Sequence, residues 1–208
     1  MSYDTIITAE AAGEVTVKKS RFIAAICPVQ SEQEATEYIK AKKKQYHDAR
    51  HNCSCYIVGK GDIEKSSDDG EPSGTAGRPM LEVIKGQGLY NVVCVVTRYF
   101  GGVLLGTGGL VRAYSDAVKE ALSVSELCQT FSVEVIEVVS DYNNWPKIEQ
   151  LARVESLLVG DTDYMENVKA KIEIPIDSVE PVIEKITDLT NAKAKITRLE
   201  TKEALRIT

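Results

Sequence analysis

The chain has 208 residues, of which 43% are hydrophobic, and carries 25 Lys and Arg against 31 Asp and Glu, giving a formal net charge of −6. This balance excludes a protein that is basic over its whole surface, so any contact with phosphate must use a local basic patch. No apolar run approaches the about 20 residues that span a bilayer, and the acidic start MSYDTIITAE lacks the layout of a signal peptide. We therefore expect a cytoplasmic protein without membrane contact.

The first part of the chain mixes expected strands and helices. Residues 15–29 read as one strand, and Ser31 with Glu34 forms a capping-box signature that opens a helix ending in a lysine cluster. A strand at 51–58, a polar loop at 59–78, a short helix at 79–85 and a strand at 91–96 follow; the apolar strand 91–96 is expected to be covered on both faces. After a glycine-rich segment, the spacing predicts a helix whose apolar face is Leu110, Ala113, Tyr114, Ala117, Val118, Ala121 and Leu122.

A new pattern begins near residue 130, where the chain also becomes more acidic. Strands are expected at 131–139, 156–164, 168–174 and 194–199. Asn144-Trp145-Pro146 opens one helix, and Ser178 is expected to cap another. The order βαββαβ suits a small ferredoxin-like sandwich. We therefore expect an α+β protein of two domains, residues 1–129 and 130–208.

The segment TRYFGGVLLGTGGLVRAY, residues 97–114, places glycines between a buried strand and a helix. A helix N-terminus offers unpaired N–H groups to anions, and arginines add charged forks. The expected anion-binding residues are Arg98, Gly101, Gly102, Gly106, Gly108, Gly109 and Arg112. In the alternative interpretation the glycines serve a tight turn and close packing, with Arg112 paired to Asp116. The spacing matches no nucleotide-binding motif, and both interpretations stay open.

The segment DDGEPSGTAGRP, residues 68–79, is a loop rich in turn formers. Solvated turn residues explain its acidic side chains better than a metal site, because the spacing of a calcium loop is absent. No Ser/His/Asp catalytic set is legible around it. Its length favours a binding role. The residues expected to contact a partner are the loop residues Asp68, Asp69, Glu71, Ser73, Thr75 and Arg78, together with the nearby His51.

Two further clusters permit chemistry. His51, Cys53 and Cys55 alternate on one strand face, but their spacing fits no usual zinc pattern, so buried thiols beside a histidine are favoured and no metal or cofactor is expected. All five cysteines are expected to be reduced. A basic patch of Lys40, Lys42, Lys43 and Lys44 lies at a helix end, and it is either solvated or in contact with phosphate.

DDGEPSGTAGRPML (68–81) and RYFGGVLLGTGGLVRAY (98–114) together resemble the two signature segments of the IMPACT family, the YigZ-like proteins of bacteria. DARHNCSCY (48–56) is similar to that family's histidine-bearing strand, so the likeness covers residues 15–125. The resemblance implies a first domain with the fold of a ribosomal protein domain and of the fourth domain of elongation factor G. It also implies a second domain like the fifth domain of that factor.

Eukaryotic members of the family regulate the stress-responsive control of translation initiation by competing for a partner protein. The resemblance therefore implies a non-enzymatic, translation-associated regulator that binds RNA, the ribosome or a regulatory partner through its N-terminal surface. The alternative is an enzyme acting on a small phosphorylated ligand. A proline-dipeptidase role is disfavoured, because His47 and His51 are the only histidines and no two-metal ligand set is evident.

Overall fold

The structure is a computed structural model that describes residues 4–207. The chain divides into two compact units: the first contains the residues up to Gln129 and the end of the chain from Arg206, and the second runs from Thr130 to Leu205. The fold is mixed α+β, with a five-stranded sheet in the first unit. In the described part of the chain no helix has the length and apolar character needed to cross a membrane.

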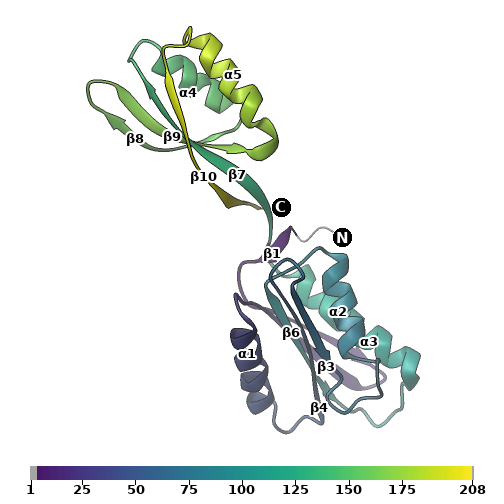
Figure 1. Cartoon of the computed structure of the whole chain (residues 1–208). Coiled ribbons are helices and arrows are strands. Elements are labelled where there is room, and N and C mark those ends of the chain that lie inside the picture. Colours follow the sequence, from purple (N-terminus) through teal and green to yellow (C-terminus); the bar gives the residue numbers. More distant parts are fainter. Residues whose placement is uncertain (1–3, 208) are drawn as a thin grey trace. The chain divides into compact units, whose positions relative to one another are not determined.

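The first unit is built on an antiparallel sheet with helices on both faces (Figure 1). Its strand order is β2 (Ala11–Val17), β3 (Ser20–Pro28), β6 (Val92–Tyr99), β4 (His51–Val58) and β5 (Ile63–Ser67). Helix α1 (Glu32–Gln45) covers one face, and α2 (Gly77–Gly86) and α3 (Gly106–Ser123) cover the other. The central strand β6 is therefore buried on both sides, as its continuous apolar run predicts.

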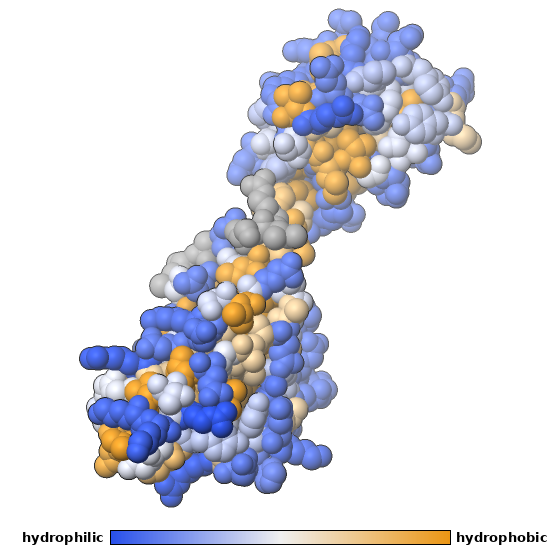
Figure 2. Space-filling model, turned by 180° about the vertical axis from the view of Figure 1, so that it is seen from behind, coloured by the Kyte–Doolittle hydropathy of each residue, from blue (hydrophilic) through white to orange (hydrophobic). Residues whose placement is uncertain are grey.

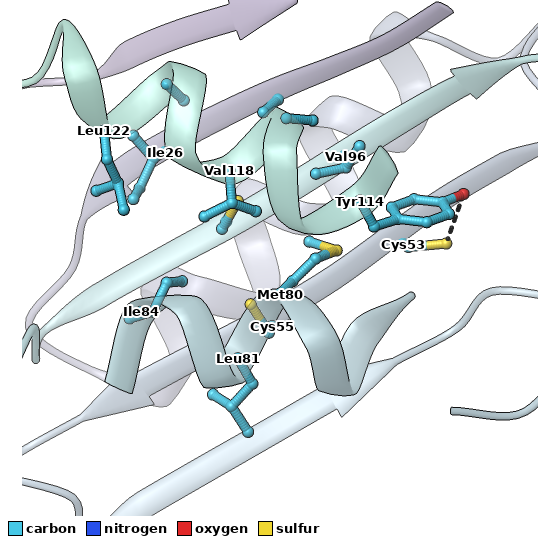
Figure 3. Packing of buried hydrophobic residues seen from close by; sticks show 14 of the residues in the cluster. Ile26, Cys53, Cys55, Met80, Leu81, Ile84, Val96, Tyr114, Val118 and Leu122 are labelled. Atoms are coloured by element: carbon cyan, nitrogen blue, oxygen red, sulfur yellow. Dashed lines mark hydrogen bonds between the residues drawn. The ribbon is translucent and has the colours of Figure 1, made fainter. Parts of the chain in front are cut away.

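The larger core of this unit lies between the sheet and helices α2 and α3. Figure 3 shows Met80 and Ile84 of α2 facing Val118 and Leu122 of α3, with strand residues between them. The buried residues of α3 are Leu110, Ala113, Tyr114, Ala117, Val118, Ala121 and Leu122, which confirms the predicted apolar face. Removal of this apolar surface from water is the main force that holds the helices on the sheet.

Helix α1 begins at the predicted cap. The Ser31 side chain accepts a hydrogen bond from the Glu34 backbone N–H at 3.2 Å. The Glu34 carboxylate accepts from the Gln30 N–H at 2.8 Å, so it stabilises the entry to the helix one residue earlier than a standard capping box. The helix ends with Lys42, Lys43 and Lys44 in its last turn, where positive charges interact favourably with the helix dipole.

Two expectations for this unit are wrong. The single strand expected over 15–29 is a hairpin, because the chain reverses at Lys18 and Lys19, whose φ angles are +46° and +70°. The expected loop 59–78 contains the edge strand β5, which pairs with β4. The turn has lysines where glycine or asparagine is more usual, and strand β5 has polar residues where β-branched residues are more usual, so neither feature stands out in the sequence.

The second unit has the predicted element order βαββαβ. Its elements are β7 (Leu127–Ser140), α4 (Trp145–Val154), β8 (Leu158–Tyr164), β9 (Val168–Pro175), α5 (Val179–Leu189) and β10 (Lys195–Ile207), with a short 3₁₀ turn at Ile176–Ser178. The strand order is β8-β9-β7-β10, and alternate residues of β9 pack against the helices as predicted. Ser178 precedes α5, but its side chain makes no capping hydrogen bond with the described residues. Residues 127–129 of β7 belong to the first unit and pair there with β1 (Thr5–Ile7), a strand that the sequence pattern did not predict.

Candidate functional site

A buried polar cluster joins the loop 68–76 to strand β6 and helix α3. Arg98 Nη1 donates to Glu71 Oε1 at 2.6 Å, and the Tyr114 hydroxyl donates to the same oxygen at 2.8 Å. The exposed fractions of the Arg98 and Glu71 side chains are 8% and 3%. A buried charge is tolerated only when it is paired and hydrogen-bonded, so these three residues depend on one another.

Two aromatic rings lie close to the Arg98 guanidinium. Its guanidinium carbon lies 5.4 Å from the ring centre of Phe22 and 5.6 Å from that of Phe100. Phe22 in turn packs edge-to-face on Tyr114, with ring centres 5.1 Å apart. The negative faces of the rings attract the guanidinium and help to hold it in place.

His51 adjoins this cluster from strand β4. It lies opposite Arg98 in the β4–β6 register. Its Nδ1 is 2.9 Å from the Asp69 carbonyl oxygen, and its Nε2 is 4.0 Å from Glu71 Oε1. Because a carbonyl oxygen only accepts, Nδ1 carries the proton and Nε2 is free to act as an acceptor when the ring is neutral.

Cys53 and Cys55 follow His51 on the same face of β4, and both are buried in the core. The Cys53 thiol donates to the Asp68 carbonyl oxygen at 2.9 Å and lies 3.3 Å from the Tyr114 hydroxyl (Figure 3). Burial raises the pKa of Cys53 to about 12, so the thiol is protonated at neutral pH. Within residues 4–207 no group of three His, Cys, Asp or Glu side chains is placed to hold a metal ion.

The acidic residues of the loop bind other parts of the unit. The Asp68 carboxylate accepts from the backbone N–H groups of Gly74, Ala76 and Gly77 at 2.7, 3.0 and 2.8 Å, and thereby caps helix α2. Burial alone would raise the pKa of Asp68, but these three donors outweigh it and the pKa is lowered. Asp69 accepts from Lys43 Nζ at 2.5 Å and from the Asn52 N–H at 2.8 Å.

The other predicted loop residues differ in their exposure. The Thr75 hydroxyl is buried and donates to the Pro72 carbonyl oxygen at 2.6 Å. Ser73 and Arg78 are exposed on the surface. The structure therefore separates loop residues with internal partners from those that remain available to a partner molecule. Partner binding by any of them stays a prediction.

The glycine-rich segment has one clear packing requirement. A Cβ on Gly101 would lie 2.0 Å from the carbonyl carbon of Lys19, so only glycine lets this segment approach the β2–β3 turn. A Cβ on Gly102, Gly106 or Gly108 would meet nothing within 4 Å. Gly109 is close to Leu105, at 3.1 Å. Close packing thus explains Gly101 and Gly109 but not Gly108, which stands in the first turn of α3.

The first turn of α3 is open to a ligand. Its N-cap residue Leu105 supplies no side-chain hydrogen bond to the described residues, so the turn's N–H groups lack a side-chain cap. Arg112 is exposed, and no described residue pairs with it; Asp116, its expected alternative partner, pairs with Lys119 at 3.4 Å. Anion binding by this turn stays a prediction.

A small hollow opens beside the buried cluster. It has a volume of about 230 Å³ and is lined by Arg50, His51, Arg98, Phe100 and Leu104. The Phe100 side chain is half exposed, at 49%, and Leu104 is 82% exposed. Figure 2 shows apolar side chains exposed among hydrophilic ones on this unit. A polar floor with an aromatic wall is typical of a ligand-binding hollow.

Exposed cations surround the same end of the sheet. We define the β6-end surface as Lys18, Lys19, Arg50, Phe100, Leu104 and Arg112. Its four cations have no carboxylate partner within residues 4–207. Of the predicted lysine patch, Lys42 pairs with Glu10 at 2.8 Å and Lys43 with Asp69, whereas Lys40 and Lys44 are exposed and unpaired among the described residues.

Sequence reasoning found Glu71, Arg98 and His51 but did not predict that Glu71 contacts Arg98. It missed Phe100 and Phe22 as neighbours of Arg98, and it assigned Tyr114 to the core alone. The motif RYFGG places Phe100 two positions after Arg98. This spacing is the one feature of the sequence that could have indicated the contact between Arg98 and Phe100.

Comparisons with known proteins agree with the division into two units. Residues 18–122 match the family model of the Impact N-terminal domain, and residues 138–193 match a domain of unknown function, DUF1949. The IMPACT family member YvyE of Bacillus subtilis is 44% identical over 184 residues, which cover 88% of this chain and 85% of that protein. YigZ of Escherichia coli, also an IMPACT family member, is 32% identical over 88% of this chain and 92% of its own. A crystal structure of a hypothetical protein is similar with a TM-score of 0.60 and 31% identity, covering 96% of this chain and 98% of that one.

Proposed function

Because this chain belongs to the IMPACT family, we propose that it is a non-enzymatic, translation-associated regulatory protein that binds RNA, free or in the ribosome, through the β6-end surface. The family resemblance supports the link to translation. The surface supports the choice of ligand, since it combines free cations with an exposed aromatic ring. A cytoplasmic location is part of the same proposal.

One observation carries the proposal of RNA binding. Lys18, Lys19 and Arg50 lack carboxylate partners within the described residues, although the chain as a whole has an excess of acidic groups. Arg50 lines the same hollow as the half-exposed ring of Phe100, and the turn that carries Lys18 and Lys19 lies against Gly101, the next residue. Proteins that bind single-stranded nucleic acid combine cations for the backbone with aromatic faces for the bases. Arg112 and the open first turn of α3 extend the cationic surface along the helix.

The enzyme alternative has one feature in its favour, which is the hollow lined by His51. Its neighbours argue for the binding role instead. The Glu71 carboxylate is occupied by Arg98 and Tyr114, so it is a poor general base. The Cys53 thiol is protonated and buried, so it is a poor nucleophile. We therefore propose a binding role for the hollow.

The proposal is tested by titrating a labelled single-stranded RNA with the intact protein at several salt concentrations. If three or four phosphates are neutralised, the log–log salt slope will be about −2 to −3. The triple variant Lys18→Gln, Lys19→Gln, Arg50→Gln should lose affinity and flatten the slope. The control variant Arg153→Gln, Lys193→Gln, Lys195→Gln has the same net charge and changes exposed cations of the second unit.

The control should bind RNA as the wild type does. Equal losses in both triple variants would show that net charge alone governs binding, and the β6-end surface would be discarded as the site. No binding to RNA at about 50 mM salt, where exposed charges are weakly screened, would overturn the proposal. That result would direct the search to a regulatory protein partner.

A further inference from the structure

The Arg98 guanidinium has a free edge. Within residues 4–207, Nη1 is the one guanidinium nitrogen with a hydrogen-bond partner, Glu71. Nε is buried and has no partner there. In a guanidinium group, Nε–H and the nearer N–H of Nη2 point the same way and form a fork that matches two adjacent acceptors. A buried donor without a partner is costly, so this fork calls for a ligand with two acceptors on one edge.

The charges around the fork favour a neutral ligand edge over an anion. Glu71 lies 2.6 Å from Nη1 and already balances the charge of Arg98. A phosphate or carboxylate on the other edge would be repelled by the Glu71 carboxylate at short range. A neutral pair of acceptors gains the same two hydrogen bonds without that repulsion.

The walls of the hollow favour a planar, partly apolar ligand. Phe100 and Leu104 are the apolar residues that line it, and the volume of about 230 Å³ is below the roughly 300–1,000 Å³ of sites for whole small molecules. A single nucleic-acid base matches this small volume and apolar lining, since unstacked bases of single-stranded RNA lie on aromatic side chains. Guanine carries two adjacent acceptors, O6 and N7, which arginine contacts in a bidentate way. Adenine presents an amino donor beside N7 and would oppose the donors of Arg98.

We propose that this hollow binds one guanine base of single-stranded RNA. This inference rests on the proposed function and specifies which nucleotide the surface recognises. Guanine O6 and N7 accept from Arg98 Nη2 and Nε, and the base lies against Phe100. Arg50 at the rim meets the adjoining phosphate. Because Nε is buried, the base reaches it only when the segment that carries Leu104, between Gly102 and Gly106, moves aside; this movement is part of the proposal.

The test compares short labelled oligouridylates that differ in one central base: guanine, 7-deazaguanine or adenine. All three have the same charge, and 7-deazaguanine lacks the N7 acceptor. With the wild-type protein, the guanine oligomer should bind about ten-fold more tightly than the other two. This comparison changes the ligand alone, so it does not depend on whether a protein variant folds.

Two variants locate the effect. Arg98→Lys keeps the charge beside Glu71 but removes the fork, so the preference for guanine over 7-deazaguanine should vanish while the salt slope is unchanged. Arg153→Lys alters an exposed arginine of the second unit, outside the β6-end surface, and should keep both the preference and the salt slope. Equal wild-type affinities for all three oligomers, with a normal salt slope, would overturn this inference and leave the proposed function standing. Failure to bind any oligomer would overturn both.

Discussion

Arg98 and Glu71 form an ion pair inside the first unit, with Arg98 Nη1 2.6 Å from Glu71 Oε1 and both side chains more than nine-tenths buried. The pair ties the loop 68–76 to the central strand β6, and Tyr114 adds a third element through the same oxygen. The acidic signature loop is therefore anchored by its buried carboxylate. Its outer residues remain on the surface.

Removal of one partner should strongly destabilise the first unit. Glu71→Ala leaves the Arg98 charge buried without compensation, and we expect a loss of roughly 3–5 kcal/mol in the free energy of unfolding. Glu71→Leu combined with Arg98→Met removes both charges and should cost less than Glu71→Ala alone. Urea titration followed by far-UV circular dichroism measures the difference.

The chain supplies an internal control for this experiment. Its single tryptophan, Trp145, lies in the core of the second unit, so its fluorescence reports that unit. The Trp145 transition should be the same in the wild type and in Glu71→Ala. A Glu71→Ala protein as stable as the wild type would show that the ion pair does not anchor the loop.

Asp68 should stabilise helix α2 in a pH-dependent way. Its folded pKa is lowered, so its contribution is present above the unfolded pKa of about 3.9 and is lost as the pH falls through that value towards the folded pKa. Asp68→Asn should cost about 1 kcal/mol at pH 7, as loss of a helix cap does. The difference from wild type should shrink between about pH 5 and pH 3.5. Glu82→Gln, on the exposed side of the same helix, should show no such trend; a constant Asp68→Asn difference would refute the capping role.

The β2–β3 turn should reveal a conflict between stability and binding. Lys18 and Lys19 both have positive φ angles, which cost non-glycine residues about 1–2 kcal/mol each. Lys18→Asn with Lys19→Gly supplies the residues that such a turn prefers and should stabilise the unit by about 1 kcal/mol. The same change removes two cations from the β6-end surface, so RNA affinity should fall. Thermal unfolding and RNA titration of one protein sample test both; unchanged RNA affinity would exclude these lysines from the interface.

The cysteines should be mostly unreactive in the folded chain. Cys53, Cys55, Cys94 and Cys128 are buried, and Cys27 is half-buried. With a pKa of about 12, on the order of one in ten thousand Cys53 thiols is ionised at pH 8. A disulfide reagent should therefore titrate at most Cys27 quickly, and all five thiols after denaturation. Because the folded pKa of Cys53 is raised, its contribution to stability should be present below about pH 8.5 and lost as the pH rises towards 12. Rapid reaction of Cys53 at pH 8 would contradict this burial.

The elements that sequence could predict are those with strong local signals. Helix α3 follows from its apolar period, and strand β9 from its alternation, because each pattern lies within a single element. The β2–β3 turn and strand β5 depend on pairing with other strands. Lysines in left-handed positions and a polar edge strand give no local indication of that pairing.

The candidate site was predictable as a set of residues but not as an arrangement. Glu71 is 27 residues from Arg98 and 43 from Tyr114, so no spacing along the chain indicates their contact. The sheet register brings His51 opposite Arg98, and this also requires tertiary structure. The sequence suggested that Arg98 faces an anion, whereas the structure adds that Glu71 already balances its charge.

The most direct test of the translation-associated role is co-sedimentation of the intact protein with ribosomes at increasing salt. We expect the wild type to sediment with ribosomes at about 50 mM salt and to be released at several hundred millimolar, because its contacts with RNA are electrostatic. The Lys18→Gln, Lys19→Gln, Arg50→Gln variant should be released at lower salt than the charge-matched control in the second unit. Wild-type protein that stays in the supernatant at 50 mM salt would contradict the proposed function.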